Sequence, residues 1–369
     1  MKTKKIMQML VIGAILIGIL ASCNTGNTES VEGLSGDSED QTANPSEKKN
    51  KSTHKSGDTI DIILVAGQSN ATGTTKVNAE EAYEILPELK ISSYPCVLTG
   101  GVVRSTNPNE LKGYYRRDID WQTTRLGMGK TTDYMGPEVG MAKELSAFYN
   151  LETDRAVGIL KYGHGGTSLL NDTSDSNQFG NWVPPSYAEK KGYAYEGATG
   201  GLYREFLQVV GEKLGALKSR GYTDFNILGL YWMQGEQDRQ HPNDYKEAFS
   251  CLVEDLRSDL SEVVKSVTGG DDKGVSELPI WVGTISRTFW NASDADQAVN
   301  AAFILMQKKL ANADNKIFVV NNSKYDVNVQ ENGVSKPVGS DNCHWSQADH
   351  IQIGRNVGRK ILIYYGFIE

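Results

Sequence analysis

The feature that most constrains this chain is a regular alternation of short apolar runs with longer amphipathic segments. The first run, Ile60 to Ala66, reads IDIILVA and is nearly continuous, as in a strand that is buried on both faces. Four further runs have strand character: 156–162, 225–233, 279–285 and 317–320. Segments with helical spacing alternate with them: 137–149, 202–219, 243–267, 296–311 and 346–363. The alternation predicts an α/β fold, a three-layer α/β/α sandwich around a mainly parallel five-stranded sheet.

Two stretches depart from this alternation. The segment from Thr72 to Tyr134 is poorly periodic, and we interpret it as an elaborated loop region. The segment 327–334 has the pattern of a hairpin that turns on Asn332-Gly333.

The first 22 residues are predicted to be a targeting signal and not part of the fold. Three lysines within the first five residues precede an apolar stretch from Ile6 to Leu20, which is shorter than the roughly 20 residues of a membrane span. The stretch ends in Leu20-Ala21-Ser22-Cys23, which resembles the lipobox of bacterial lipoproteins. We therefore expect lipidation of Cys23; the alternative is a simple secretory signal with an incidental cysteine.

The residues from 23 to 57 are almost all polar, so they cannot bury enough surface to offset their chain entropy. We expect them to form a flexible tether, followed by one domain from 58 to 369. The expected location is that of an exported bacterial lipoprotein, periplasmic or on the cell surface, attached to the membrane through the lipid alone. The net charge of -8 and the pI near 5.3 argue against nucleic acid as a partner.

The cysteines do not form a disulfide framework. If Cys23 is lipidated, the odd number that remains cannot all pair: Cys96, Cys251 and Cys343. Cys251 falls in a helical pattern and is expected to be a small buried hydrophobic residue. A bridge between Cys96 and Cys343 is left open, because sequence gives no geometry.

Polar motifs follow three of the predicted strands: Gly67-Gln68-Ser69-Asn70, Gly163-His164-Gly165-Gly166-Thr167 and Gln234-Gly235-Glu236-Gln237-Asp238. A serine on a tight turn after a strand is accessible and lies near N–H groups that can stabilise an anion. Adjacent glycines allow a backbone N–H to reach a ligand. Each motif alone is equally compatible with an ordinary turn or helix cap. In parallel sheets, however, ligands bind beyond the carboxyl ends of the strands, where all three motifs are expected.

A fourth motif, Asp341-Asn342-Cys343-His344, precedes the last predicted helix. Histidine is the usual base for a hydroxyl nucleophile, and a carboxylate fixes its tautomer. Metal ligation is the other interpretation of this pair. A catalytic zinc site needs three protein ligands, and the remaining histidines are scattered along the chain, so no metal and no other cofactor is expected.

Taken in order, the four motifs resemble the SGNH/GDSL hydrolase superfamily. Within it they are most similar to the branch that contains sialate O-acetylesterases and the acetylxylan esterases of carbohydrate esterase family six. The resemblance covers roughly residues 58 to 365. It implies a flavodoxin-like SGNH hydrolase fold and a carbohydrate O-acetylesterase that acts on acetylated glycans of the xylan or sialate type.

The resemblance also implies roles for individual residues. Ser69 is expected to be the nucleophile, His344 the base and Asp341 its orienting acid. The oxyanion hole would use the Ser69 N–H, the N–H of Gly165 or Gly166, and the side chain of Gln234, where the wider superfamily has asparagine. The residues expected to bind substrate, or to position the loops around it, are Gln68, Asn70, Glu236 and Asp238.

Two alternatives remain open at this point. One is a lipid or thioester acyl hydrolase of the same fold, since fold does not determine substrate. The other is a surface lipoprotein that binds glycans without turnover, which the seventeen tyrosines and six tryptophans would suit. Such a binder has no need of serine, histidine and aspartate together.

Overall fold

The computed structural model describes residues 59–90, 94–106, 114–172, 180–289, 293–312, 315–325, 328–331, 334–337 and 343–369. The predicted signal peptide, the tether and Cys23 lie outside these residues, so the domain boundary at residue 58 stays a prediction. Among the described helices, none combines the length and the hydrophobicity that a membrane span requires.

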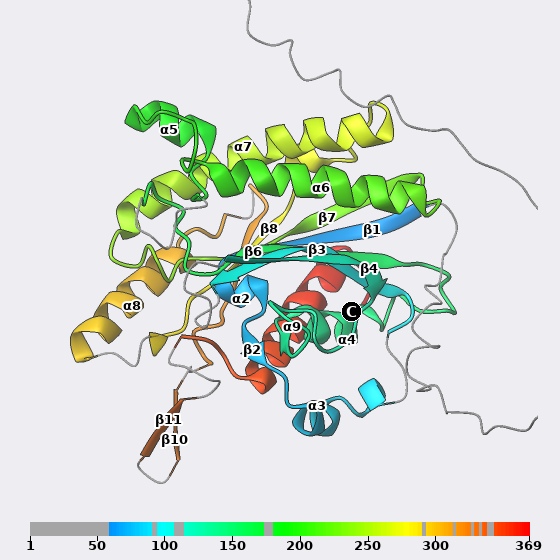
Figure 1. The fold of residues 1–369 in the computed structure, drawn as a ribbon, viewed down its shortest axis with the longest axis horizontal. Coiled ribbons are helices and arrows are strands. Elements are labelled where there is room, and N and C mark those ends of the chain that lie inside the picture. The colour runs from blue at the N-terminus through cyan, green and yellow to red at the C-terminus, as the bar shows by residue number, and fades with distance from the viewer. Residues whose placement is uncertain are drawn as a thin grey trace, which may run out of the picture. The chain divides into compact units, whose positions relative to one another are not determined.

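A seven-stranded sheet lies at the centre of the fold, in the order β4-β3-β6-β1-β7-β8-β9 (Figure 1). Its strands are β1 (Thr59–Gly67), β3 (Val97–Thr106), β4 (Tyr114–Thr123), β6 (Val157–His164), β7 (Asp224–Met233), β8 (Ile280–Gly283) and β9 (Ile317–Val320). Every neighbouring pair is parallel except β3 and β4, which are antiparallel. The prediction of a mainly parallel α/β fold is confirmed.

Helices cover both faces of the sheet (Figure 1). One face carries α5 (Pro185–Lys191), α6 (Gly201–Ser219) and α7 (Pro242–Thr268), and α8 (Asp294–Lys308) joins the same hydrophobic core. The other face carries α4 (Glu138–Leu145) and α9 (Gln347–Tyr364). Except for α5, which was not predicted, these helices lie where the spacing predicted them, and their ends differ from the prediction by a few residues. Ser346 caps α9, as expected, and accepts a hydrogen bond from the Asp349 N–H.

Strand β1 shows why its sequence is apolar at nearly every position. Successive side chains of a strand point to opposite faces of the sheet. Ile62 and Leu64 therefore belong to the core beneath α6 and α7, whereas Ile63 and Val65 belong to the core beneath α4 and α9. Helices cover both faces of β1, and its neighbours β6 and β7 take up its backbone hydrogen bonds, so apolar side chains suit nearly every position.

The prediction for the segment from Thr72 to Tyr134 was wrong, because it holds two strands of the sheet and a short helix, α3 (Ala79–Ile85). Gly100 and Gly101 give β3 the composition of a turn, yet both are needed inside the strand. A Cβ at Gly100 would lie 2.7 Å from the Trp121 ring, and one at Gly101 would lie 1.9 Å from the Lys161 carbonyl oxygen. The sheet consequently has seven strands where five were predicted.

The smaller elements are α2 (Ser69–Thr72), the 3-10 helices η1 (Pro87–Lys90) and η3 (Val275–Glu277), and the paired strands β2 (Thr75–Lys76) and β5 (Tyr134–Met135). Strands β10 (Asn328–Glu331) and β11 (Val334–Pro337) pair antiparallel with Glu331 opposite Val334, which confirms the predicted hairpin. Its two turn residues lie outside the described part of the chain.

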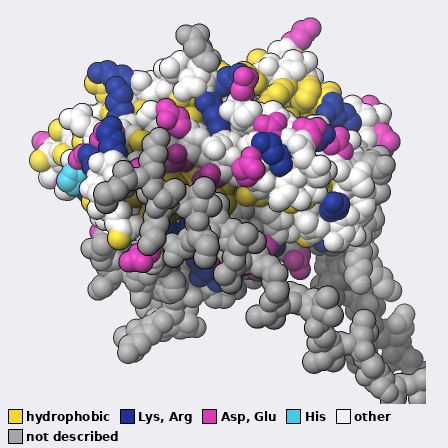
Figure 2. All heavy atoms as spheres, turned by 90° about the horizontal axis from the view of Figure 1, so that it is seen from above, with side chains coloured by type: hydrophobic (Ala, Val, Ile, Leu, Met, Phe, Trp, Pro, Cys, Tyr) yellow, Lys and Arg dark blue, Asp and Glu magenta, His cyan; other side chains and the backbone are white. Residues whose placement is uncertain are grey.

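Acidic and basic side chains are interspersed on the face of the molecule that Figure 2 shows. On this side of the sheet, Lys190 and Lys191 of α5 both form ion pairs with Glu247 of α7. The exposed pairs link the short helix to the long one but contribute little to stability, because water and salt screen them.

The described cysteines do not bear out a bridge. Cys96 is a buried free thiol, so the disulfide to Cys343 that the sequence left open is not formed. Cys251 is half-buried on α7, where it packs against the core.

Candidate active site

The three strand-end motifs meet at one edge of the sheet. Strand β1 pairs in parallel with β6 and β7, and the register sets Gly67 opposite both Gly163 and Met233. The residues that follow these three positions therefore leave the sheet side by side at its carboxyl edge. This is the convergence that the order of the motifs predicted.

Ser69 is the first residue of α2, a single helical turn directly after β1. The chain turns sharply at Gly67, which has φ of +143° and whose Cβ, if present, would lie 2.0 Å from the Met233 carbonyl oxygen. The Gln68 N–H donates to that same oxygen at 2.9 Å. The turn leaves Ser69 8% exposed, and its N–H is among those of a first helical turn that have no acceptor within the helix.

The glycines after β6 lie beside this serine. A Cβ at Gly165 would be 3.6 Å from the Ser69 Cβ. The Gly165 N–H donates to the Arg104 carbonyl oxygen at 3.2 Å, in continuation of the pairing between β6 and β3. Of the two glycines predicted as oxyanion donors, Gly165 is thus already engaged. Gly166, which has a φ of +71°, is the second of the two glycines and is left as the expected oxyanion donor.

Gln234 does not have the orientation that its predicted role requires. Its side chain is buried, and its Nε2 donates to Asp238 Oδ2 at 2.5 Å and to the Thr167 carbonyl oxygen at 3.0 Å. A side-chain amide has two N–H bonds, and both are used here. The longer side chain reaches back to Asp238, so in this structure it offers no donor to an oxyanion.

Asp238 organises the loop after β6. Its buried carboxylate accepts hydrogen bonds from the Ser168 hydroxyl, from the Leu169 N–H at 2.8 Å and from Gln234. Burial raises the pKa of Asp238, and these hydrogen bonds oppose that rise. With an exposed fraction of 2%, Asp238 has no surface for substrate. Between the two expected roles, the structure supports the positioning of the loop.

Glu236 contacts the serine turn and lies within electrostatic range of His344. It is buried, and its Oε1 accepts a hydrogen bond from Asn70 Nδ2 at 2.9 Å. Burial raises the pKa of Glu236, whereas the hydrogen bond from Asn70 and the positive charge of His344 act in the opposite direction. His344 therefore lies within electrostatic range of a carboxyl group that contacts the residue next to Ser69. Gln68, the other flanking residue, is buried as well.

His344 is half-buried and lies just before α9, where the neighbouring Trp345 anchors it. The Trp345 carbonyl oxygen accepts a hydrogen bond from the Thr75 hydroxyl at 2.6 Å, and its indole N–H donates to the Tyr325 carbonyl oxygen at 3.1 Å. Thr75 follows α2 closely, so the first of these bonds ties the histidine segment to the chain that leaves the serine turn. Asp341 lies outside the described residues, and its role stays a prediction.

Residues 59–362 match the family described as carbohydrate esterase, sialic acid-specific acetylesterase. The chain belongs to this family. The prediction of a serine esterase for acetylated carbohydrate, made from the four motifs, is confirmed at the level of the family. A comparison of this esterase with curated proteins found no match.

Three solved structures are similar to the esterase. A protein from Arabidopsis thaliana is 18% identical over 82% of this chain and 98% of its own, with a TM-score of 0.44. A carbohydrate acetylesterase from Xanthomonas citri is 15% identical over 83% of this chain and 57% of its own, also with a TM-score of 0.44. An acetylxylan esterase from Geobacillus stearothermophilus is 11% identical over 83% of this chain and 96% of its own, with a TM-score of 0.36.

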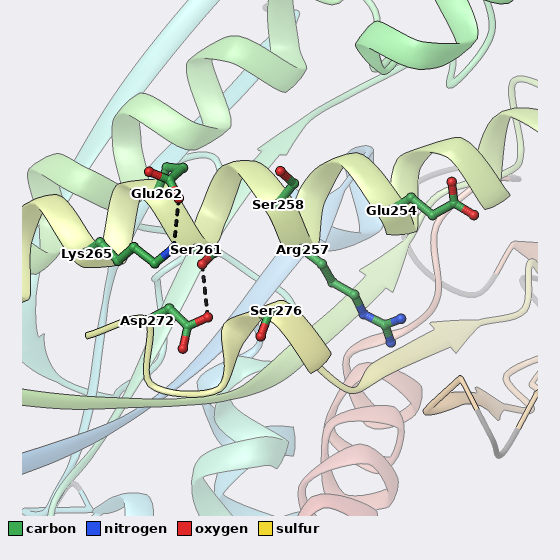
Figure 3. Close-up of a pocket in the computed structure, with 8 residues that line it drawn as sticks. All are labelled: Glu254, Arg257, Ser258, Ser261, Glu262, Lys265, Asp272 and Ser276. Atoms are coloured by element: carbon green, nitrogen blue, oxygen red, sulfur yellow. Dashed lines mark hydrogen bonds and ion pairs between the residues drawn. The ribbon is translucent and has the colours of Figure 1, made fainter. Parts of the chain in front are cut away.

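A separate pocket of about 500 Å³ lies between α7 and η3 of the esterase (Figure 3). Polar and charged side chains line it, among them Arg257, Lys265 and Asp272. The 3-10 helix η3 directly precedes β8, so this pocket is at the amino edge of the parallel sheet, whereas Ser69 is at the carboxyl edge. It is not part of the active site.

Sequence reasoning missed three residues that support the site: Thr75, Tyr325 and Lys161. Nothing in their local sequence marks Thr75 or Tyr325, because their contacts join segments far apart in the chain. Lys161 did carry a signal, since it is a charged residue in the otherwise apolar run AVGILKY.

Proposed function

We propose that this carbohydrate esterase removes acetyl groups from glycan hydroxyls through an acyl-enzyme formed on Ser69. The observation that carries the proposal is the meeting of the serine turn, the glycines after β6 and the motif after β7 at one edge of the sheet. The hydrogen bond from Thr75, which follows α2, to the carbonyl oxygen of Trp345, the neighbour of His344, supports His344 as the general base.

In the first step the His344 imidazole takes the proton of the Ser69 hydroxyl, and the serine oxygen attacks the acetyl carbonyl carbon. The negative charge that develops on the carbonyl oxygen is stabilised by the N–H groups of Ser69 and Gly166. When the tetrahedral intermediate collapses, the bond to the sugar oxygen breaks, and the imidazolium returns the proton to the leaving hydroxyl. Water, deprotonated by His344, then releases acetate from the serine by the reverse sequence.

Two carboxyl groups are proposed to interact with the imidazole ring of His344. Asp341 orients the ring, as the motif predicts. Glu236 lies within electrostatic range of the ring, whose positive charge opposes the rise that burial causes in the pKa of Glu236. Asn70 holds Glu236 in place through the hydrogen bond of 2.9 Å.

The activity is tested by acetate release from a panel of acetylated xylan, acetylated pectin and O-acetylated sialosides. The enzyme is expected to release acetate from at least one of them, and Ser69→Ala is expected to lose nearly all of this activity. Equal rates for the two proteins would contradict the assignment of the nucleophile. A preference for octanoyl over acetyl esters would instead favour a lipid or thioester hydrolase.

We also propose that the esterase is exported and anchored by lipid on Cys23. The lipobox-like sequence and the polar tether support this location. Incorporation of an alkyne-labelled fatty acid into the full chain, with Cys23→Ala as the control, is the test. Labelling that persists in the variant would contradict the proposal.

A further inference from the structure

The single helical turn that begins at Ser69 is too short to hold its own orientation. An isolated helix of one turn is unstable, since its nucleation costs more than its few hydrogen bonds return. All four residues of α2 are buried. The turn lies directly on β6, where a Cβ at Gly163 would come within 2.6 Å of the Thr72 backbone nitrogen. Contacts with the surrounding elements must therefore set the position of α2, and β6 provides several of them.

Lys161 makes such a contact from within the sheet. It lies on β6 two residues before Gly163, so its side chain is on the same face of the strand as α2. Val157 and Ile159 precede it on this face and belong to the hydrophobic core with α4 and α9. A lysine with an exposed fraction of 0% is costly in such a core, and a specific arrangement must compensate for it.

The Lys161 ammonium donates to three acceptors from three separate segments. It binds the Glu138 Oε2 at 2.7 Å, the Met128 carbonyl oxygen at 3.0 Å and the Thr72 carbonyl oxygen at 3.3 Å. An ammonium group has three N–H bonds, so its capacity is filled. Glu138 is also fully buried, and its other oxygen accepts a hydrogen bond from the Gly136 N–H at 3.0 Å.

Thr72 is the last residue of α2, so its carbonyl oxygen is one of those that a helix leaves without an internal partner. A cation at this end of the turn also interacts favourably with the helix dipole. Burial lowers the pKa of Lys161, and the Glu138 carboxylate opposes this. The same ammonium therefore satisfies the carboxyl end of α2 and ties it to α4 and to the segment around Met128.

We propose that Lys161 is a positioning residue for the nucleophile, its ammonium fixing the carboxyl end of the turn whose first residue is Ser69. The inference rests on the proposed function, because it takes Ser69 to be the nucleophile. A displacement of about 1 Å in a reacting group lowers turnover by about a hundredfold. Loss of the Lys161 contacts should therefore reduce turnover rather than substrate binding.

The test removes the buried pair as a unit, because removal of one partner alone leaves a buried charge uncompensated. The variant carries Lys161→Met and Glu138→Gln. A version with Glu138→Met replaces it if the first does not fold. The control carries Arg155→Met and Asp61→Asn, which removes an ion pair of the same length, 2.7 Å, with a buried carboxylate at the opposite edge of the sheet.

Active sites are titrated with diethyl p-nitrophenyl phosphate, which phosphorylates reactive serines, and mass spectrometry locates the adduct. The rate of p-nitrophenyl acetate hydrolysis per titrated site excludes the unfolded fraction. We expect kcat per site to fall about tenfold to a hundredfold in the Lys161 variant with KM little changed, and to stay within about twofold in the control.

A Lys161 variant whose kcat per site stays within about twofold of the wild type, or falls no further than that of the control, would overturn the inference. An adduct on another residue of the wild-type protein would overturn the proposed function instead. The two failures are therefore distinguishable in one experiment.

Discussion

Replacement of His350 with phenylalanine is expected to make the protein more resistant to acid. His350 lies in α9, is fully buried and packs edge-on against Trp345, with 5.9 Å between the ring centroids. Neither of its ring nitrogens has a hydrogen-bond partner among the described residues. Burial lowers the pKa of His350 to about 3, and the positive charges of His344 and Lys161 act in the same direction.

The size of the effect follows from the difference between the folded and the unfolded chain. In the unfolded chain the ring has its ordinary pKa of 6.5. The folded-state pKa is lower, so below pH 6.5 the unfolded chain binds more protons, and the free energy of unfolding falls as the pH falls. Each pH unit below the unfolded pKa costs about 1.4 kcal/mol, which amounts to about 2 kcal/mol between pH 7 and pH 5. The stability that depends on a neutral His350 is fully present above pH 6.5 and is lost as the pH falls toward 3.

The assay is urea unfolding at pH 7 and pH 5 for the wild type, His350→Phe and His241→Phe, in which an exposed histidine is replaced. We expect the His350 variant to lose about 2 kcal/mol less than the other two proteins on acidification. Burial also lowers the pKa of His164, to about 4, but this residue adds the same loss of stability on acidification to all three proteins. The same loss in all three proteins would refute the reasoning.

Three further substitutions test the contacts around the site. Asp238→Ala leaves buried donors without an acceptor, so the free energy of unfolding should fall by roughly 3 kcal/mol or more in urea titrations; a loss below about 1 kcal/mol would contradict this. Gly165→Ala places a methyl in ordinary contact with Ser69, so the free energy of unfolding should change by less than about 1 kcal/mol. The kcat/KM for p-nitrophenyl acetate should nevertheless fall at least about tenfold, because the methyl lies beside the nucleophile. An unchanged kcat/KM would place the substrate elsewhere. Gly101→Ala forces a Cβ against the Lys161 carbonyl oxygen at a φ of +144°, and thermal unfolding should show a loss of roughly 3 kcal/mol or more, in contrast to a tolerated methyl at Gly165.

Hydrophobic periodicity was sufficient to predict the centre of the fold. Strand β1 and its neighbours β6 and β7 are buried on both faces, so their sequences are nearly continuous runs of apolar residues. The two strands at one side of the sheet, β3 and β4, were not predictable from apolar runs. In β4, the exposed Asp118 and Asp120 alternate with the buried Ile119 and Trp121. In β3, the two adjacent glycines are typical of a turn in sequence, although they lie within a strand. Their role becomes visible only when the Trp121 ring and the Lys161 carbonyl oxygen are in place.

The position of the candidate active site was predictable for a topological reason, whereas the orientation of its side chains was not. Parallel strands end at a common edge, so motifs after β1, β6 and β7 had to meet there. The direction in which the Gln234 amide points depends instead on Asp238 and on the Thr167 carbonyl oxygen. Likewise, the hydrogen bond from the Gly165 N–H to Arg104 depends on β3, a strand that the sequence did not reveal.

The hydrogen bond between Thr75 and the Trp345 carbonyl oxygen spans 270 residues of sequence. In the proposed mechanism, the nucleophile follows the first strand of the sheet, whereas its base precedes α9, so the two meet only when α9 has packed onto the sheet. By this mechanism, a nascent or truncated chain without α9 would have the serine but no base beside it. The proposed mechanism therefore couples hydrolytic activity to completion of the core that α9 forms with α4.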